Sequence, residues 1–375
     1  QKELVGLAIQ HFFPSVVMGC GSSTSSSSPS KKKPLEEDPN PNSNYLVGEK
    51  LPRRCSYSEC FEGTHKRDGS KAVLRSIPKA HPLFDHGVIM EELKSMQGVQ
   101  HPSCIRVFEV WEDDDAIHYA EELVEGEEVL EGLARRQDVT DAEAAKLIVQ
   151  LLEAVAYLHH RGVVHRELLP KHFIALKSSS PQTPAVKIMN IGLHSLKQVM
   201  DLKSIRSGKG GSGFPPFHWA PEIAKSVLDR QDIEYTEKSD VWSMGVMLYI
   251  LLCGYPPFFS DNGTILLQRI STAELAYAQS EWDHVPLEAK QLVEWMLTVD
   301  PSKRPSAADA LTHPWLKGID ERTPTTLHVH VQLVDIIAKL RNRRTLHVVS
   351  AVARLGTERK LKLAKEAAAA EKGGG

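Results

Sequence analysis

The strongest constraint on the fold is a change of sequence pattern near Gly126. Before this point, strand-like apolar runs surround a single amphipathic helix, IMEELKSMQGV at 89–99. The clearest strand-like runs are KAVLRSIPK (71–79), IRVFEVWE (105–112) and AIHYAEELV (116–124). After it, apolar residues recur at helical spacing, most clearly in AEAAKLIVQLLEAVAYLHHRG at 142–162. A small strand-rich part followed by a larger helix-rich part predicts an α+β fold with two lobes.

Composition divides the chain into three parts. Residues 19–44 are polar and rich in Ser and Pro, which is typical of disordered segments. From Tyr45 the composition becomes globular, and after Trp315 it becomes basic and mixed. We therefore predict a disordered segment at 1–44, a folded domain at 45–316 with lobes at 45–124 and 125–316, and a basic helical tail at 317–375.

Charge, hydropathy and cysteine content exclude several classes of protein. A formal net charge of -3 over 375 residues argues against a nucleic-acid-binding chain. No apolar run of about 18 residues or more occurs, so we expect no transmembrane helix. The cysteines form neither a disulfide framework nor a zinc-binding spacing, which favours a cytoplasmic protein with reduced thiols. They are Cys20, Cys55, Cys60, Cys104 and Cys253.

A set of short motifs occurs in a fixed order through the folded domain. They are HRELLP (165–170), NIG (190–192), APE (220–222), DVWSMG (240–245), DPSKRP (300–305) and HPWL (313–316). Together they resemble the eukaryotic protein kinases. GYPPFF (254–259) and RPSAADALTHPWL (304–316) are most similar to the calcium/calmodulin-dependent and calcium-dependent protein kinases. The resemblance implies a bilobal kinase fold over 45–316, with a small β-rich N-lobe and a larger α-helical C-lobe.

The residues that would cover a nucleotide depart from this family. Kinases close over the phosphates with a loop of three glycines, because glycine lets the backbone approach closely. Here the matching run, LPRRCSYS (51–58), has Pro52, Arg54 and Tyr57 at those positions. Pro52 removes an N–H donor and Tyr57 adds bulk. Arg54 could attract phosphate, but a side-chain cation does not replace a closed loop.

The family's phosphate-pairing lysine of strand β3 is Arg75 here, and its αC glutamate partner is Glu92. The charge is kept, but a guanidinium is larger than an ammonium and not equivalent to it. We therefore expect an Arg75–Glu92 ion pair that orders the lobe without aiding catalysis. The resemblance places the nucleotide-binding hinge at Glu122 to Val124.

Three other side chains are predicted to crowd the adenine pocket. Val73 replaces a small alanine of the family, and Glu59 stands near its β2 valine. Glu121 occupies the gatekeeper position and brings a charge to an apolar pocket. These residues favour an empty pocket over one that binds nucleotide.

The loop at 165–173 keeps the family's structural residues but replaces those that carry chemistry. His165, Arg166 and Pro170 match the family. The replacements are Glu167 for the catalytic aspartate, Leu169 for the phosphate-contacting lysine and His172 for the metal-binding asparagine. Glutamate moves the carboxylate outward, and catalysis is sensitive to displacements of about 1 Å. Magnesium prefers oxygen ligands, so a histidine serves it poorly.

The family's metal-binding Asp-Phe-Gly is Asn190-Ile191-Gly192 here, so an uncharged amide replaces a carboxylate. The resemblance implies ATP and magnesium as cofactors, but the replacements argue against both, and we predict no certain cofactor. The scaffold positions, in contrast, match the family. They are Gly192, the ion-pairing Glu222 and Arg304, and the helix anchor Asp240.

A candidate acylation site lies near the start of the chain. MGCGSS (18–23) fits the pattern for myristoylation at Gly19 and palmitoylation at Cys20, provided that translation starts at Met18. Two lipid signals hold a protein at a membrane stably, whereas one does so only marginally. The pattern predicts attachment to a membrane such as the plasma membrane. The alternative is a chance Met-Gly pair in a disordered arm.

The tail carries a predicted basic amphipathic helix. Its apolar residues are Leu333, Ile336, Ile337 and Leu340, followed by Arg341, Arg343 and Arg344. Such helices are typical of calmodulin targets and autoinhibitory segments. The alternative is a helix that simply packs on the C-lobe.

These patterns together favour a pseudokinase: a kinase frame with impaired catalysis that serves as a scaffold or allosteric regulator in calcium/calmodulin-type signalling. Candidate partners are calmodulin, an active kinase and a membrane surface, and no nucleic acid is expected. Two alternatives stay open. One is a low-activity, ATP-dependent Ser/Thr protein kinase with Glu167 as an adapted base, and the other is a module that binds nucleotide without transfer.

Overall fold

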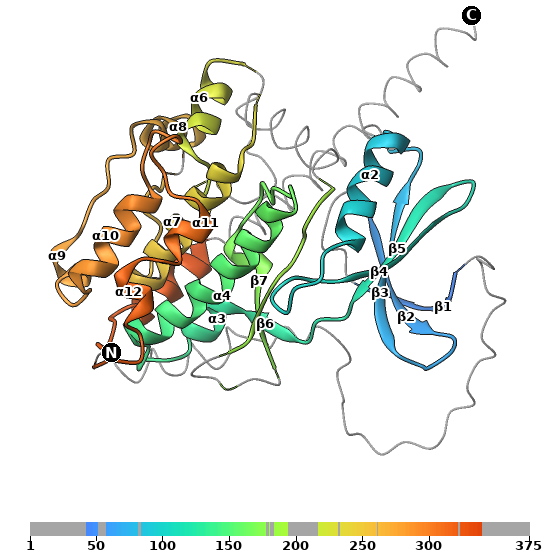
Figure 1. Cartoon of the computed structure of the whole chain (residues 1–375), viewed down its shortest axis with the longest axis horizontal. Coiled ribbons are helices and arrows are strands. Elements are labelled where there is room, and N and C mark those ends of the chain that lie inside the picture. Colours follow the sequence, from blue (N-terminus) through green and yellow to red (C-terminus); the bar gives the residue numbers. More distant parts are fainter. Residues whose placement is uncertain are drawn as a thin grey trace, which may run out of the picture.

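The computed structural model has two lobes that lie side by side (Figure 1). It describes residues 43–51, 58–81, 84–177, 180, 184–193, 217–231, 233–260, 262–321 and 323–339. The N-lobe is built mainly of strands and the C-lobe mainly of helices, which confirms the predicted α+β, two-lobed fold.

The N-lobe is a five-stranded antiparallel sheet with strand order β1-β2-β3-β5-β4. The strands are β1 (Tyr45–Lys50), β2 (Glu59–His65), β3 (Lys71–Pro78), β4 (Val107–Glu112) and β5 (Ala116–Glu122). β3 lies at the centre of the sheet, so side chains on β3 and β5 reach one another across the sheet.

Helix α2 (His86–Gln97) lies against the N-lobe sheet. It begins where the side chain of Asp85 accepts a hydrogen bond from the amide of Val88, an N-cap that satisfies an otherwise unpaired helix donor. Its buried residues Ile89, Leu93 and Met96 pack in one cluster with β-strand residues and with Leu193 of the C-lobe. The orientation of α2 therefore depends on a segment far along the chain.

The C-lobe is organised around helix α7 (Glu237–Cys253), in which every residue from Ser239 to Cys253 is buried. Helix α4 (Asp141–His160) packs on it and begins with a capping box between Thr140 and Glu143. The remaining elements are β6 (Gly126–Glu128), α3 (Val129–Leu133), η1 (Pro170–His172), β7 (Phe173–Leu176), β8 (Val186–Ile188), α6 (Pro221–Leu228), α8 (Gly263–Thr272), α9 (Gln279–Trp282), α10 (Leu287–Met296), α11 (Ala307–Ala310) and α12 (Pro314–Lys317). Among the helices described here, none is long and apolar enough to cross a membrane.

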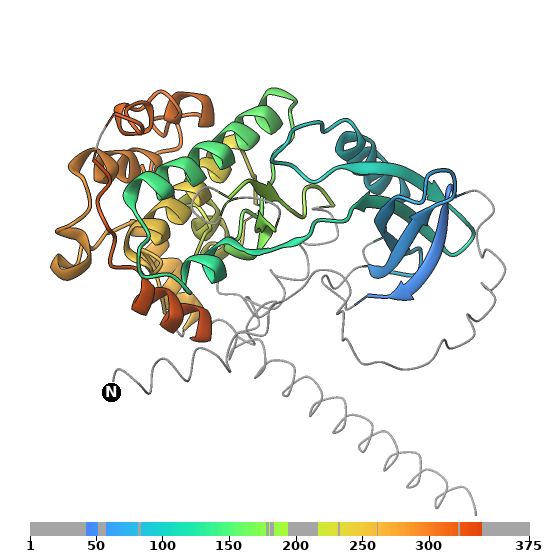
Figure 2. The ribbon, with the colours of Figure 1, turned by 90° about the horizontal axis from the view of Figure 1, so that it is seen from below.

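Part of the predicted tail belongs to the C-lobe core. Residues 330–339 form a helix, and the segment lies on the C-lobe, where Figure 2 draws it in red. Leu333, Ile336 and Ile337 are buried in the same cluster as the C-lobe helices. Just before this helix, the amide of Leu327 donates to the carbonyl of Val139 (2.8 Å). The packed unit thus continues past residue 316.

We predict that Leu333→Ala lowers the free energy of unfolding by about 2–5 kcal/mol, because it removes a fully buried side chain and leaves a cavity. Val331→Ala is the matched control, since Val331 is 71% exposed on the same helix. Its effect should stay within about 0.5 kcal/mol. Urea unfolding followed by tryptophan fluorescence measures both. Equal stability of the two variants would contradict the docked tail.

Candidate active site

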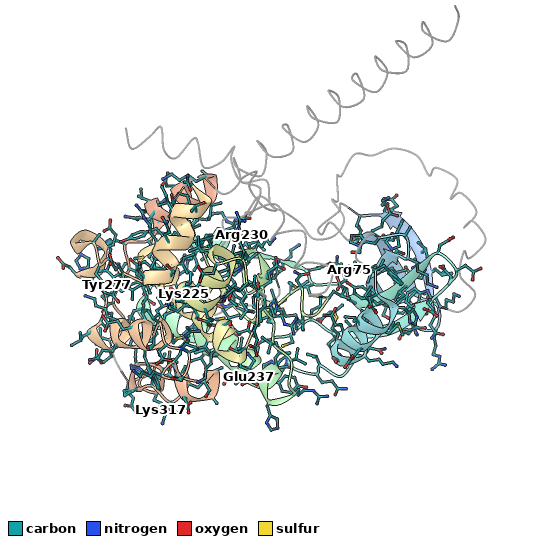
Figure 3. All side chains as sticks on the ribbon, turned by 90° about the horizontal axis from the view of Figure 1, so that it is seen from above. Arg75, Lys225, Arg230, Glu237, Tyr277 and Lys317 are labelled. Atoms are coloured by element: carbon teal, nitrogen blue, oxygen red, sulfur yellow. The ribbon has the colours of Figure 1, made fainter. Side chains whose placement is uncertain are left out.

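The cation at the β3 position, Arg75, is bound to the gatekeeper residue. Its Nε donates to Glu121 Oε1 at 2.6 Å, and both side chains are buried. Its Nη1 also donates to the sulfur of Cys60, the residue directly opposite on β2 (3.3 Å). Arg75 lies on the side of the N-lobe that faces the C-lobe (Figure 3). The sequence suggested Glu92 as its partner; that residue lies half-buried on α2, and the Arg75–Glu92 pair stays a prediction.

The prediction that Glu59 crowds the adenine pocket is wrong. Glu59 accepts a hydrogen bond from Lys50 on β1 (2.6 Å) at the surface of the sheet. Successive residues of a strand point to opposite faces, and the next residue, Cys60, is the one that contacts Arg75. The sequence alignment to the family therefore assigned the wrong face to this part of β2. Val73 lies opposite Glu121 in the β3–β5 register.

At the hinge, the Glu122 side chain forms an ion pair between the lobes. Lys187 on β8 donates to Glu122 Oε2 (2.9 Å) and to the carbonyl of Cys104 (3.3 Å). Val124 follows and is buried in the C-lobe cluster. The sequence analysis missed Lys187, because a lysine in a short strand carries no signal that identifies its partner.

The replaced residues of the loop at 165–173 bond to one another. The amide nitrogen of Asn190 lies 2.9 Å from Glu167 Oε2 and 3.4 Å from His172 Nε2. On the other side of the imidazole ring, His172 Nδ1 lies 2.8 Å from the carbonyl oxygen of Glu167. Leu169, at the family's lysine position, is buried and offers no charge. The structure thus brings together Glu167, His172 and Asn190, which occupy the family's catalytic and metal positions.

These side chains do not fit a magnesium ion. Magnesium requires oxygen ligands in near-octahedral geometry, usually including carboxylates. Here an imidazole nitrogen takes one ligand position, and an uncharged amide donates to the remaining carboxylate. Across the residues that the structure describes, no group of three or more His, Cys, Asp or Glu side chains could hold a metal.

Asp240 on α7 holds the loop at 165–173 in place. Its carboxylate accepts hydrogen bonds from the backbone amides of His165 (2.7 Å) and Arg166 (2.8 Å). A third contact reaches His159 Nε2 at 2.9 Å. Arg166 has a φ of 64°, a left-handed backbone conformation that residues other than glycine rarely adopt. The two hydrogen bonds from the backbone amides to Asp240 compensate for that strain.

A second anchor joins Glu222 on α6 to Arg304. The two side chains form a bidentate pair with both distances at 2.9 Å. The guanidinium is fully buried and lies over the ring of Trp242. Gly192 is the remaining scaffold residue and has a φ of 76°. Glycine is required there because a Cβ would lie 2.5 Å from the sulfur of Met96 on α2.

His218 is a buried residue of the site that the sequence analysis did not single out. Neither ring nitrogen has a hydrogen-bond partner among the described residues. Burial lowers its pKa to about 4; the nearby Glu167 carboxylate opposes this shift, and Lys171 and His165 add to it. No motif in the sequence analysis includes His218.

Several predicted residues lie outside the described part of the chain. They are Pro52, Arg54 and Tyr57 of the phosphate-covering loop, Gly19 and Cys20 of the acylation pattern, and Leu340, Arg341, Arg343 and Arg344 of the tail.

Comparisons with known proteins agree with this geometry. Residues 54–316 match the family model described as protein kinase domain, and the chain belongs to that family. It is 33% identical to a calcium/calmodulin-dependent protein kinase type II of Caenorhabditis briggsae, over 83% of this chain and 56% of that protein. Calcium-dependent protein kinase 12 of Arabidopsis thaliana is 32% identical over 74% of this chain and 54% of its own length.

A calcium/calmodulin-dependent protein kinase type 1 of Macrobrachium nipponense is 30% identical over 84% of this chain and 87% of that protein. The chain spans about half the length of the other two relatives. The matches confirm the predicted resemblance to the calcium/calmodulin-dependent and calcium-dependent group of Ser/Thr protein kinases.

We predict that acid destabilises the protein through His218. In the unfolded chain its pKa is 6.5 and in the folded protein about 4, so protons bind the unfolded state first as the pH falls. The stability that depends on neutral His218 is complete above about pH 6.5, and roughly 2 kcal/mol of it is lost by about pH 5. His218→Phe should remove this component of the pH dependence of urea unfolding. His160→Phe, at an exposed position on α4, should leave it in place.

Arg304→Ala should lower the free energy of unfolding by about 3–5 kcal/mol, because it leaves the Glu222 carboxylate without its main partner. The neighbouring Lys303→Ala is the control. Lys303 is 77% exposed and its ion pair with Asp300 is long, at 3.7 Å, so its loss should change stability by less than about 1 kcal/mol. Thermal and urea unfolding measure both variants. A small effect of Arg304→Ala would show that the anchor is not important for stability.

Proposed function

We propose that this member of the kinase family is a pseudokinase, which acts as a scaffold or allosteric regulator in calcium/calmodulin-type signalling. The observation that carries the proposal is the buried ion pair between Arg75 and Glu121. It commits the cation at the family's phosphate-contacting position to the side chain at the family's gatekeeper position.

The energy of this ion pair argues against nucleotide binding. For Arg75 to reach a phosphate, it must give up its ion pair with the buried Glu121 carboxylate, and breaking a buried ion pair typically costs about 3–5 kcal/mol. A micromolar ligand gains only about 8 kcal/mol in total, and each 1.4 kcal/mol is roughly a tenfold loss of affinity. Such a ligand would weaken by roughly two to three and a half orders of magnitude.

The catalytic loop supports the same conclusion. The Glu167 carboxylate, which would have to accept the proton of a substrate hydroxyl, already accepts a hydrogen bond from Asn190. Leu169 cannot neutralise charge on a transferred phosphoryl group. The frame around them is retained through Asp240 and through the Glu222–Arg304 pair. A stable frame without chemistry is suited to binding protein partners.

The partners belong to the proposal as well. The names of the relatives point to calmodulin and calcium as regulators, and an active kinase is a second candidate partner. Because Leu333, Ile336 and Ile337 are buried against the C-lobe, calmodulin would engage this part of the tail only after it undocks. Attachment to a membrane through acylated Gly19 and Cys20, with a cytoplasmic location, rests on the sequence pattern alone.

One observation favours a low-activity Ser/Thr protein kinase as the second candidate. Glu167 keeps a carboxylate on a loop that Asp240 holds in place, and Asn190 next to it retains an oxygen. The relatives are protein kinases by name. In that case, Glu167→Gln would abolish the transfer.

The deciding experiment is a thermal melt of the full chain with ATP, in magnesium, manganese or EDTA. A ligand of the native state must raise the melting temperature by mass action, so we expect no shift at millimolar nucleotide. Glu121→Met should introduce a nucleotide-dependent shift, because it releases Arg75 from the pair. Glu112→Met, which removes an exposed carboxylate from β4, is the matched control.

A metal-dependent shift of the wild-type chain by ATP would contradict the pseudokinase. A radiometric assay with basic protein substrates then decides between binding alone and transfer. Phosphate incorporation that disappears in Glu167→Gln would establish the low-activity kinase instead.

A further inference from the structure

We propose that Asn190 is a metal-independent latch: its amide takes the place of a cation between Glu167 and His172 and holds the N-lobe helix α2 in position. This inference rests on the proposed function and deepens it. It explains how the site stays ordered when the residues that would hold a metal have changed.

The first step is the hydrogen-bond chemistry of His172. Its Nδ1 lies 2.8 Å from the Glu167 carbonyl oxygen, which can only accept, so Nδ1 carries the proton. In the neutral ring, Nε2 then carries a lone pair. Nε2 and Glu167 Oε2 are therefore two acceptors, and both lie within reach of the same atom of Asn190.

Two acceptors directed at one point need either a cation or a group with two protons. The amide nitrogen of Asn190 has two N–H bonds, one for Glu167 Oε2 at 2.9 Å and one for His172 Nε2 at 3.4 Å. Aspartate, the residue of the family at this position, has no such donor when ionised. The change to asparagine thus matches the change to histidine: together they satisfy the site without a metal.

The second step connects Asn190 to the N-lobe. Asn190 has a φ of 64°, and the two residues that lead from it, Ile191 and Gly192, are buried. Leu193 follows and packs in one cluster with Leu93 and Met96 of α2. Fixing the side chain of Asn190 therefore fixes the segment on which α2 rests, and no nucleotide takes part in this contact.

The test is to return the family's residue by Asn190→Asp in the full chain. This places a second carboxylate at hydrogen-bond distance from Glu167, so the pair should hold a proton more tightly than an isolated carboxyl does. With EDTA at neutral pH we expect the melting temperature to fall by about 5 °C or more. The difference in melting temperature from the wild type should close when both proteins are measured at about pH 5. It should also close with Mn²⁺, whose affinity for mixed nitrogen and oxygen ligands exceeds that of Mg²⁺.

The wild-type chain should melt at one temperature in EDTA, Mg²⁺ and Mn²⁺. Asn262→Asp is the matched control, because the Asn262 side chain caps helix α8 as an acceptor and aspartate serves that role equally well. Under each of these conditions it should melt like the wild type. A variant Asn190→Asp that melts like the wild type and ignores pH and Mn²⁺ would overturn the latch.

Hydrogen exchange tests the link to α2 without a new charge. In Asn190→Ala, the amides of α2 should exchange faster, whereas those of α10, remote from the site, should not change. Unchanged exchange in α2 would overturn the coupling. Stabilisation of the wild type by Mn²⁺ or Zn²⁺ that is lost in His172→Phe would also overturn the latch, since the three side chains would then be a metal site.

These outcomes are separable from those of the proposed function. Insensitivity of Asn190→Asp, with no nucleotide shift in the wild type, would overturn the latch and leave the pseudokinase standing. Phosphate transfer that requires magnesium and Glu167 would overturn both.

Discussion

The ordered state of the whole site depends on one buried carboxylate, that of Asp240. It accepts the backbone amides of His165 and Arg166 and thereby holds Arg166 in a left-handed conformation, which costs about 1–2 kcal/mol in an L-residue. The position of Glu167 and His172 follows from that backbone. Because α7 is buried along nearly its whole length, Asp240 cannot shift to follow a change in the loop.

Around this loop, three described side chains at the family's nucleotide-binding and catalytic positions bond to other residues of the protein. Arg75 pairs with Glu121, Glu122 pairs with Lys187, and Glu167 accepts the amide of Asn190. Buried polar groups are costly unless they are bonded, so replacing a ligand's contacts requires a new internal partner for each group. The described residues that differ from the family therefore bond to one another or to neighbouring side chains.

The sequence predicted the frame well and the partners poorly. Strand and helix periodicity placed β3, β5 and α4, and the motif order located Asp240, Glu222 and Arg304. The choice of Glu121 by Arg75 could not be predicted, because it depends on side-chain geometry across β3 and β5. The face of Glu59 was wrong because a one-residue difference in strand register reverses every side chain. His218 carried no signal in the sequence, since its burial, with no hydrogen-bond partner among the described residues, is visible only in three dimensions.

Gly254 bears on how this domain can be recombined with others. Its φ is 87°, and a Cβ there would lie 2.7 Å from the carbonyl oxygen of Val329, so the end of α7 packs closely against the chain leading into the helix at 330–339. The backbone hydrogen bond from Leu327 to Val139 is a second contact between the C-lobe and the segment after residue 316. A chimera that joins this C-lobe to the tail of another kinase must therefore keep both contacts, and residue 316 is a poor junction for it.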